Sequence, residues 1–170
     1  MSADRYRRWF EYEKDVNAKV LWSIQAVPPS VRDRPEFQRA VDLMMHMTAA
    51  RRMWLYRFGV IPAGPTTVDE LEPHGCDPAL LPEALRQVEE VWSRYLETLT
   101  DAELSRRFEY RALEGRAYSN TVEDVLTQLF GHGWYHRGQI AVLLRSIDSQ
   151  PASTDFILWA REAADVAKSS

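Results

Sequence analysis

Residues 122–147 read VEDVLTQLFGHGWYHRGQIAVLLRSI, and this stretch decides the fold. Its apolar residues recur at the three- and four-residue spacing of an amphipathic helix. Two histidines, His132 and His136, stand four positions apart, so both side chains lie on one helix face. Apolar residues share that face, which predicts that it is buried: Leu129, Ile140 and Leu143. Two imidazoles placed in this way can bind one metal ion.

A third histidine lies in a second predicted helix, residues 35–58, which starts with a proline and ends before Gly59. His46 is about midway along this helix, and Ala49 and Ala50 follow it at i+3 and i+4. Small side chains at these positions would leave space for a cavity above the imidazole. A single histidine in such a helix is most often a core or boundary residue, and the residues alone leave that reading open.

Three glycines, Gly131, Gly133 and Gly138, surround the histidine pair. Each glycine costs a helix ~0.5–1 kcal/mol relative to alanine. We therefore expect another chain segment or a ligand to come close to the helix here. The alternative for His132 and His136 is a pair of core histidines that bond to backbone carbonyls.

The remaining pattern predicts an all-α protein: a four-helix bundle with an extra C-terminal helix and a short β-hairpin before the fourth helix. The first helix is ended by two prolines, the third is opened by an aspartate–proline pair, and the hairpin is indicated by alternating polar and apolar residues. These further elements are expected at residues 4–26, 78–98, 107–119 and 153–164. One domain, residues 1–170, is the simplest organisation for this length.

Residues 59–78 are rich in proline and glycine and lack helical periodicity, so they predict a long loop. Such a loop could cover the mouth of a site. His74 and Cys76 could bind metal, but two such residues arise easily by chance, and we favour the reading that neither is a ligand. Asn17 falls on the apolar face of the first helix and needs hydrogen-bond partners. Those partners could be a neighbouring loop or the site.

Composition excludes several functions. The chain has 170 residues, 45% hydrophobic and 27% charged, which is typical of a folded protein. A net charge of −4 gives no support for nucleic-acid binding. No apolar run approaches the ~20 residues of a membrane span, and the first residues lack the apolar core of a signal peptide. The single cysteine, Cys76, fits a reducing compartment, so we expect a cytoplasmic protein. From the net charge and the lack of a long apolar run we expect it to bind neither nucleic acid nor membranes.

Three neutral imidazoles would leave one metal position open for water or substrate, as in catalytic zinc sites. Nickel, iron and manganese compete with zinc, because imidazole suits several of these ions. Metal-bound water or thiol would then be the nucleophile, and no side chain is identified as catalytic. Arg137 is a weak candidate for steering an anionic substrate to a cavity near Trp134 and Tyr135. The alternative for Arg137 is an ordinary exposed arginine.

Residues that hydrogen-bond to the imidazoles should fix which ring nitrogen carries the proton. Helical position alone makes Asp42, Gln128 and Gln139 the candidates for this role.

Several stretches resemble one known family. HGWYHRGQI, residues 132–140, is similar to the signature of the DinB family of DinB/YfiT-like metalloenzymes. FEYEKDVNAKVLW, HMTAARRMWLYRF, the hairpin and PASTDFILWA also resemble family segments. The resemblance implies a four-helix bundle that holds a divalent metal, often zinc or nickel, through His46, His132 and His136. It also implies a homodimer, which is a frequent state in the family.

Related members of this superfamily use low-molecular-weight thiols such as mycothiol and bacillithiol, and others are named for induction by DNA damage. The resemblance thus supports a metal-dependent thiol S-transferase or hydrolase that acts on a small molecule. The competing hypothesis is a non-enzymatic stress-related protein in which the metal stabilises the bundle.

Overall fold

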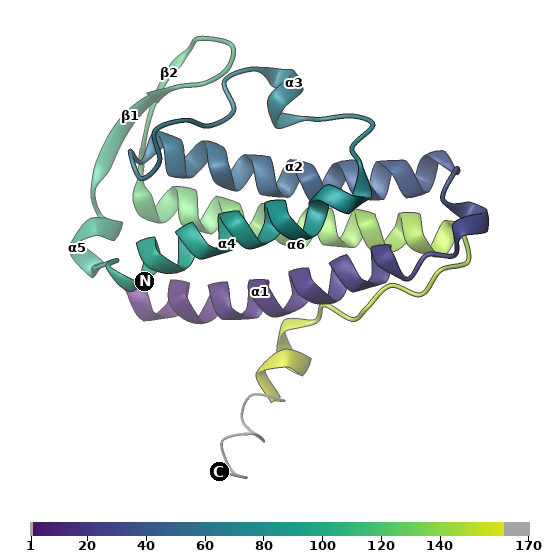
Figure 1. Ribbon diagram of the computed structural model, residues 1–170. Helices are drawn as coiled ribbons and strands as arrows, with labels where there is room; N and C mark the ends of the chain where they lie inside the picture. The colour runs from purple at the N-terminus through teal and green to yellow at the C-terminus, as the bar shows by residue number, and fades with distance from the viewer. Residues whose placement is uncertain (1, 162–170) are drawn as a thin grey trace.

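A computed structural model describes residues 2–161 of the chain. Four long helices form the bundle: α1 (Ala3–Gln25), α2 (Pro35–Arg57), α4 (Leu81–Glu97) and α6 (Val122–Ser146). Helices α1 and α6 run in one direction and α2 and α4 in the opposite direction (Figure 1). Helix α2 packs along α6 and also contacts α1 and α4. The predicted all-α bundle is confirmed.

Shorter elements join the long helices. They are two 3-10 turns, η1 (Pro29–Val31) and η2 (Pro78–Leu80), the one-turn helices α3 (Val68–Leu71) and α5 (Asp101–Leu104), and the strands β1 (Arg107–Arg111) and β2 (Ala117–Thr121). The strands pair antiparallel, which confirms the predicted hairpin, and β2 leads directly into α6. Thr121 and Asp124 form a capping box that fixes where α6 begins.

The long connection between α2 and α4 passes back over α2, so the two helices can run in the same direction (Figure 1). The sequence predicted a loop here, but residues 68–71 form helix α3. Thr67 and Glu70 make a capping box at its start, and the Glu70 carboxylate also accepts a hydrogen bond from the Thr66 hydroxyl. A single capped turn is too short to show helical periodicity, and the prediction therefore missed it.

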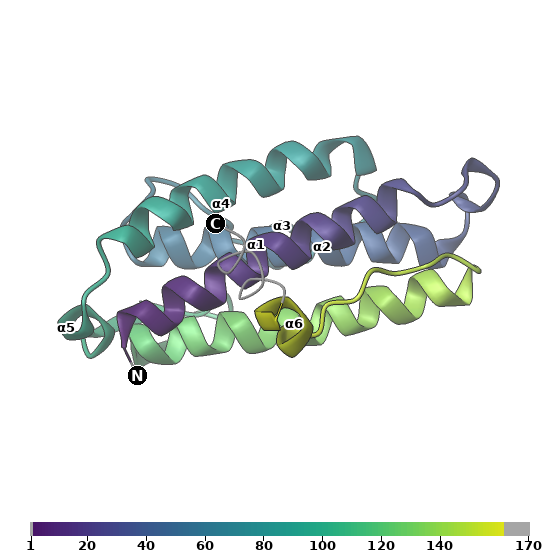
Figure 2. The ribbon, with the colours of Figure 1, turned by 90° about the horizontal axis from the view of Figure 1, so that it is seen from below.

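The C-terminal segment runs back from the end of α6 along the outside of the bundle, beside α1 (Figure 2). Residues 156–161 are helical, and the rest of the predicted helix, up to residue 164, lies outside the described residues. The predicted start at residue 153 is too early. The Thr154 carbonyl accepts a hydrogen bond from the Tyr12 hydroxyl at 2.5 Å, and Asp155 caps the turn through the Ile157 amide at 2.9 Å.

The apolar core divides into two clusters along the bundle. One cluster lies toward the hairpin and includes Phe10, Trp92 and Phe130, and the other lies toward η1 and includes Ile24 and Ile140. On α1, α2 and α6 a polar layer separates the two clusters. Its buried members are Glu13, Asn17, Arg51 and Arg137, and the three histidines lie at the same level of α2 and α6.

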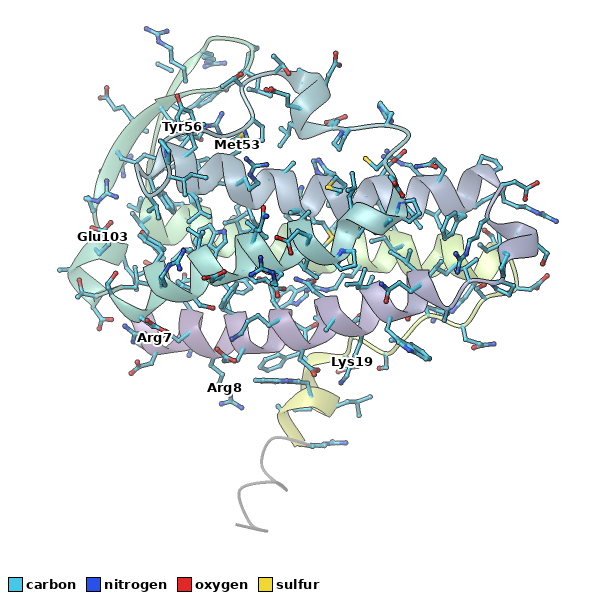
Figure 3. All side chains as sticks on the ribbon, in the orientation of Figure 1. Arg7, Arg8, Lys19, Met53, Tyr56 and Glu103 are labelled. Carbon is cyan, nitrogen blue, oxygen red and sulfur yellow. The ribbon has the colours of Figure 1, made fainter. Side chains whose placement is uncertain are left out.

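Side chains from all four helices fill the interior and close its ends (Figure 3). At the α5 end, Arg7 of α1 donates from Nε to the Leu96 carbonyl at 2.9 Å and from Nη2 to the Leu99 carbonyl. The guanidinium therefore joins the start of α1 to the end of α4 and to the residues that follow it. Among residues 2–161, no helix is long and apolar enough to cross a membrane.

Candidate metal centre

The three predicted histidines meet on the contact between α2 and α6. His132 Nε2 lies 3.0 Å from His46 Nε2 and 3.0 Å from His136 Nε2. One ring nitrogen from each residue thus falls within 4.8 Å of the others, a group that could hold a metal ion. Nitrogens bound to one tetrahedral zinc ion at 2.0–2.1 Å are about 3.4 Å apart, close to the spacing found here.

Hydrogen bonds at the outer nitrogens fix the tautomers of two rings. His46 Nδ1 lies 2.6 Å from the Leu71 carbonyl, and His136 Nδ1 lies 2.7 Å from Gln139 Oε1. Because an oxygen of either kind can only accept, both Nδ1 atoms carry a proton. In a neutral ring, Nε2 then presents a lone pair to the centre.

This arrangement of lone pairs fits a bound cation. His46 Nε2 and His136 Nε2 both direct lone pairs toward His132 Nε2, which carries at most one proton. One proton can satisfy one of these contacts and leaves the lone pair of the other histidine without a donor. A metal ion at the centre would accept all three, and the donor set therefore suits zinc, nickel and similar ions.

Burial favours the neutral forms of His132 and His136. Burial, with the neighbouring His136, His46 and Arg51, lowers the pKa of His132 from 6.5 to about 3. Burial also lowers the pKa of His136, although its bond to Gln139 acts in the opposite direction. Imidazole must be neutral to bind a metal, so these rings are ready to do so at neutral pH.

Of the predicted tautomer-fixing residues, Gln139 is confirmed and the other two are wrong. Asp42 binds the long loop instead: its carboxylate accepts from the Gly75 amide at 3.2 Å and the Cys76 amide at 2.9 Å. Gln128 lines a separate groove beside Tyr110. The partner of His46 is a backbone carbonyl in α3, which no side-chain pattern could reveal.

His74 and Cys76 lie outside the histidine cluster, as favoured from the sequence. The His74 side chain is 75% exposed and reaches only to 4.0 Å from Asp42. Burial and the neighbouring Asp42 raise the pKa of the Cys76 thiol to about 11. A thiol that keeps its proton is a poor metal ligand, and it is not a reactive nucleophile either.

The prediction that another group comes close to each of the three glycines is wrong for two of them. A Cβ atom added to Gly131 or Gly138 would meet nothing within 4 Å, so neither glycine is needed for a close approach. Gly133 is needed, because its added Cβ would lie 2.5 Å from Glu13 Oε1 and 2.9 Å from an Arg137 nitrogen. The close neighbour is thus an ion pair and not a ligand.

The expected cavity above His46 is not formed by the two alanines that follow it. Ala50 is packed in the core. Ala49 lines a 420 Å³ cavity under the long loop, and His46 is not among its lining residues.

Arg137 is not an exposed arginine. Its side chain is 1% exposed, and Nη1 donates to Glu13 Oε1 at 3.3 Å and to Asn17 Oδ1 at 3.0 Å. Its guanidinium also lies 5.6 Å from the centre of the Tyr12 ring. Arg137 therefore faces the bundle interior, away from the predicted cavity near Trp134, and the proposed steering role is wrong.

Arg137 belongs to a buried charge network that the sequence analysis missed. Glu13 also binds Arg51 of α2, and Asn17 Nδ2 donates to Glu89 of α4 at 3.4 Å. Asn17 thus finds its partners in this network. Burial raises the pKa of Glu89 to about 7. One signal was available in the sequence, because Glu13 follows Phe10 and precedes Asn17 at helical spacing on the apolar stripe.

Comparison with known proteins gives one match, and it is to a family model. No curated protein matches the chain. The model of the DinB family matches residues 1–166, essentially the whole sequence. The bundle, the hairpin before α6 and the three-histidine cluster agree with the resemblance noted in the sequence. The chain therefore belongs to the DinB family.

Proposed function

We propose that this protein is a divalent-metal-dependent enzyme, a thiol S-transferase or hydrolase that acts on a small molecule. The ion is zinc or nickel, with iron or manganese as alternatives, and its ligands are His46, His132 and His136. The observation that carries the proposal is the convergence of three Nε2 atoms with too few protons to satisfy one another. Packing alone does not explain why these lone pairs converge on one point.

An open coordination position favours catalysis over a structural role. Among residues 2–161, no fourth histidine, cysteine, aspartate or glutamate joins the cluster. Structural zinc sites fill four positions with protein atoms, whereas catalytic sites keep one for water or substrate. When bound, the metal would supply Lewis-acid activation and would lower the pKa of a coordinated thiol or water.

The protein's own contribution is to position the ligands. Gln139 and the Leu71 carbonyl hold the Nδ1 protons of His136 and His46, which keeps both Nε2 atoms available. The ion pair of Glu13 with Arg137 fixes α6 against α1, one residue beyond His136. These contacts hold the triad in place before the metal arrives, which reduces the ordering cost of binding.

Metal content tests the ligand assignment. Wild-type protein without a His-tag, His46→Ala, His132→Ala and His136→Ala are purified in parallel and analysed for metals. His74→Ala is the matched control, because His74 is exposed and outside the cluster. We expect near-stoichiometric metal in wild type and in His74→Ala, and loss in the three cluster variants. Equal content in all five proteins would overturn the assignment.

The second candidate is a non-enzymatic stress-related protein in which the metal only stabilises the bundle. One observation favours it: the cluster joins α2 to α6, so a bound ion would cross-link the two helices. Cobalt-substituted protein separates the candidates. A change in the cobalt spectrum on adding bacillithiol, mycothiol or glutathione supports the enzyme, and a coordination sphere closed by four protein atoms supports the alternative.

A homodimer is also part of the proposal and is supported by the family resemblance. Sedimentation of the purified protein tests it, because the chain mass is 19.7 kDa. A single species of about that mass across the accessible concentrations would overturn the dimer.

A further inference from the structure

A groove of about 490 Å³ runs along the outer contact between α2 and α6, and we call it the α2–α6 groove. Its walls are mainly apolar and come from Leu43 of α2 and from Tyr135, Gly138 and Val142 of α6. Tyr135 and Val142 are each 64% exposed, so the apolar surface faces solvent. The volume falls within the range of small-molecule sites, ~300–1,000 Å³.

The α2–α6 groove continues the face that carries the histidine triad. On α2, Leu43 precedes His46 by three residues and Arg39 precedes it by seven, which is the spacing of one helix face. On α6, Gln139 follows His136 by three residues and also lines the groove. Because α2 and α6 run in opposite directions, both sets of residues extend from the triad toward the same end of the bundle (Figure 1).

A positive charge lies at the far end of the groove. Arg39 lines it and is exposed, and within residues 2–161 no carboxylate forms an ion pair with this guanidinium. Seven residues of α-helix separate Arg39 from His46, a rise of roughly 10 Å. The groove thus offers an apolar wall and a cation. None of the three histidines lines it, and Gln139, which bonds to His136 Nδ1, connects it to the triad.

We propose that the α2–α6 groove binds the substrate of the metal centre, and that this substrate is an elongated molecule with an apolar chain. One end carries the group that reaches the metal, and the other carries an anionic group that pairs with Arg39. The inference rests on the proposed function, because it uses the open metal position to hold one end of the molecule. It adds a substrate class and a binding surface to that function.

Gly138 allows the groove to be filled without disturbing the fold. A Cβ atom there would meet nothing within 4 Å, so Gly138→Leu adds an isobutyl group to open space in the groove. Leucine is also the better helix former, by somewhat under ~1 kcal/mol. Gly131→Leu is the matched control. Gly131 has the same open surroundings on the same helix but does not line the groove.

The test uses cobalt-loaded protein and three thiol probes, with the cobalt spectrum as the readout. The probes are mercaptoacetate, 8-mercaptooctanoate and its neutral analogue 8-mercapto-1-octanol. We expect 8-mercaptooctanoate to bind at least tenfold more tightly than mercaptoacetate, because each buried methylene contributes ~0.8 kcal/mol. It should bind roughly two- to fivefold more tightly than the alcohol, and Arg39→Gln should remove that difference.

The groove variants give the decisive comparison. Gly138→Leu should weaken 8-mercaptooctanoate by at least tenfold and leave mercaptoacetate unchanged, whereas Gly131→Leu should change neither. Equal affinities of the short and long probes, or no effect of Gly138→Leu, would overturn the groove and leave the proposed function intact.

If no thiol changes the cobalt spectrum, the thiol-dependent form of the proposed function fails. The groove is then tested by NMR titration of octanoate into metal-free protein. Shifts at the amides of Gly138 and Val142 would support it, and their absence would overturn it.

A second copy of the chain is the other possible occupant. Sedimentation of wild type and Gly138→Leu at equal concentrations distinguishes the two. An unchanged oligomeric state supports a small-molecule groove. Conversion of a wild-type dimer to a monomer by Gly138→Leu would show that the groove is a protein interface and would overturn the proposal.

Discussion

Two polar clusters lie at the same level of the bundle and draw on the same two helices. The charge network takes Arg51 from α2 and Arg137 from α6, and it joins them to Glu13 of α1. The histidine triad takes His46 from α2 and a pair from α6. Both clusters interrupt the apolar core at a place where the bundle could have continued it.

The two clusters differ in charge: the charge network holds both signs and is complete in this sense, although Arg137 Nε and Nη2 have no hydrogen-bond partner among the described residues. In the charge network, Glu13 accepts from two arginines, so the chain supplies both signs of charge. In the triad, three Nε2 atoms converge and no described side chain supplies a cation among them. A buried polar group needs a partner, and no described residue supplies a cation that all three nitrogens can share. This difference is why we propose the triad, and not the charge network, as the functional site.

The largest expected effect breaks the complete cluster. Glu13→Ala leaves Arg51 and Arg137 buried without their common carboxylate, which should lower the free energy of unfolding by about 3–5 kcal/mol. Urea denaturation of metal-free protein measures this change. His132→Ala under the same conditions should cost much less, because its ring has no complete set of partners to lose. Equal losses in the two variants would contradict the comparison.

A smaller effect is expected where the two clusters adjoin. Gly133→Ala places a methyl group against Glu13 Oε1 and should destabilise the protein by about 1–3 kcal/mol. Gly131→Ala, in open surroundings, should instead stabilise it by about 0.5–1 kcal/mol. The cost of Gly133→Ala should fall in a Glu13→Ala background, and a double-mutant cycle by urea denaturation measures this.

Metal affinity should depend on Gln139, which binds the outer nitrogen of His136. Gln139→Leu removes the acceptor that holds the Nδ1 proton of His136, and loss of such a partner lowers metal affinity by about 10–100-fold. Competition with a chromophoric chelator measures the dissociation constant. Gln128→Leu is the matched control, because Gln128 lies on the same helix but lines a different groove. Equal loss in both variants would argue against a tautomer effect.

The two clusters should respond to pH with opposite signs. Folded His132 has its pKa lowered to about 3 by burial, so the unfolded ring takes up its proton first, near 6.5. Unfolding of metal-free protein should therefore become easier as pH falls from about 6.5 toward 3, by at most about 1.4 kcal/mol per pH unit for each histidine.

Glu89 acts in the other direction. Burial raises its pKa from 4.5 to about 7, so the folded carboxyl keeps a proton that the unfolded chain releases. Its contribution to stability declines as pH rises from about 4.5 to 7. Denaturation at several pH values with a chelator present measures both slopes, and Glu89→Gln should remove only the second. A wild-type profile unchanged by that substitution would contradict the assignment.

The sequence predicted the long helices and the His132–His136 pair because both depend on local spacing, whereas His46 was assigned from the family resemblance. The i,i+4 placement of His132 and His136 fixes their common face wherever the helix packs. Contacts between helices could not be predicted in the same way, because the Glu13–Arg137 ion pair depends on how α1 and α6 pack in space. For the same reason all three glycines near the histidines were expected to have a close neighbour, when only Gly133 has one, and that neighbour is the Glu13–Arg137 ion pair.

One contact in the metal centre would be invisible to residue-by-residue mutational scanning. His46 is oriented by the Leu71 main-chain oxygen, which every amino acid carries. Substitutions at position 71 can leave this acceptor unchanged, so tolerance there would not show that the position is unimportant. Shortening or lengthening the segment around α3 would move the oxygen and alter His46. The orientation of His46 therefore depends on the length of this connection more than on its composition.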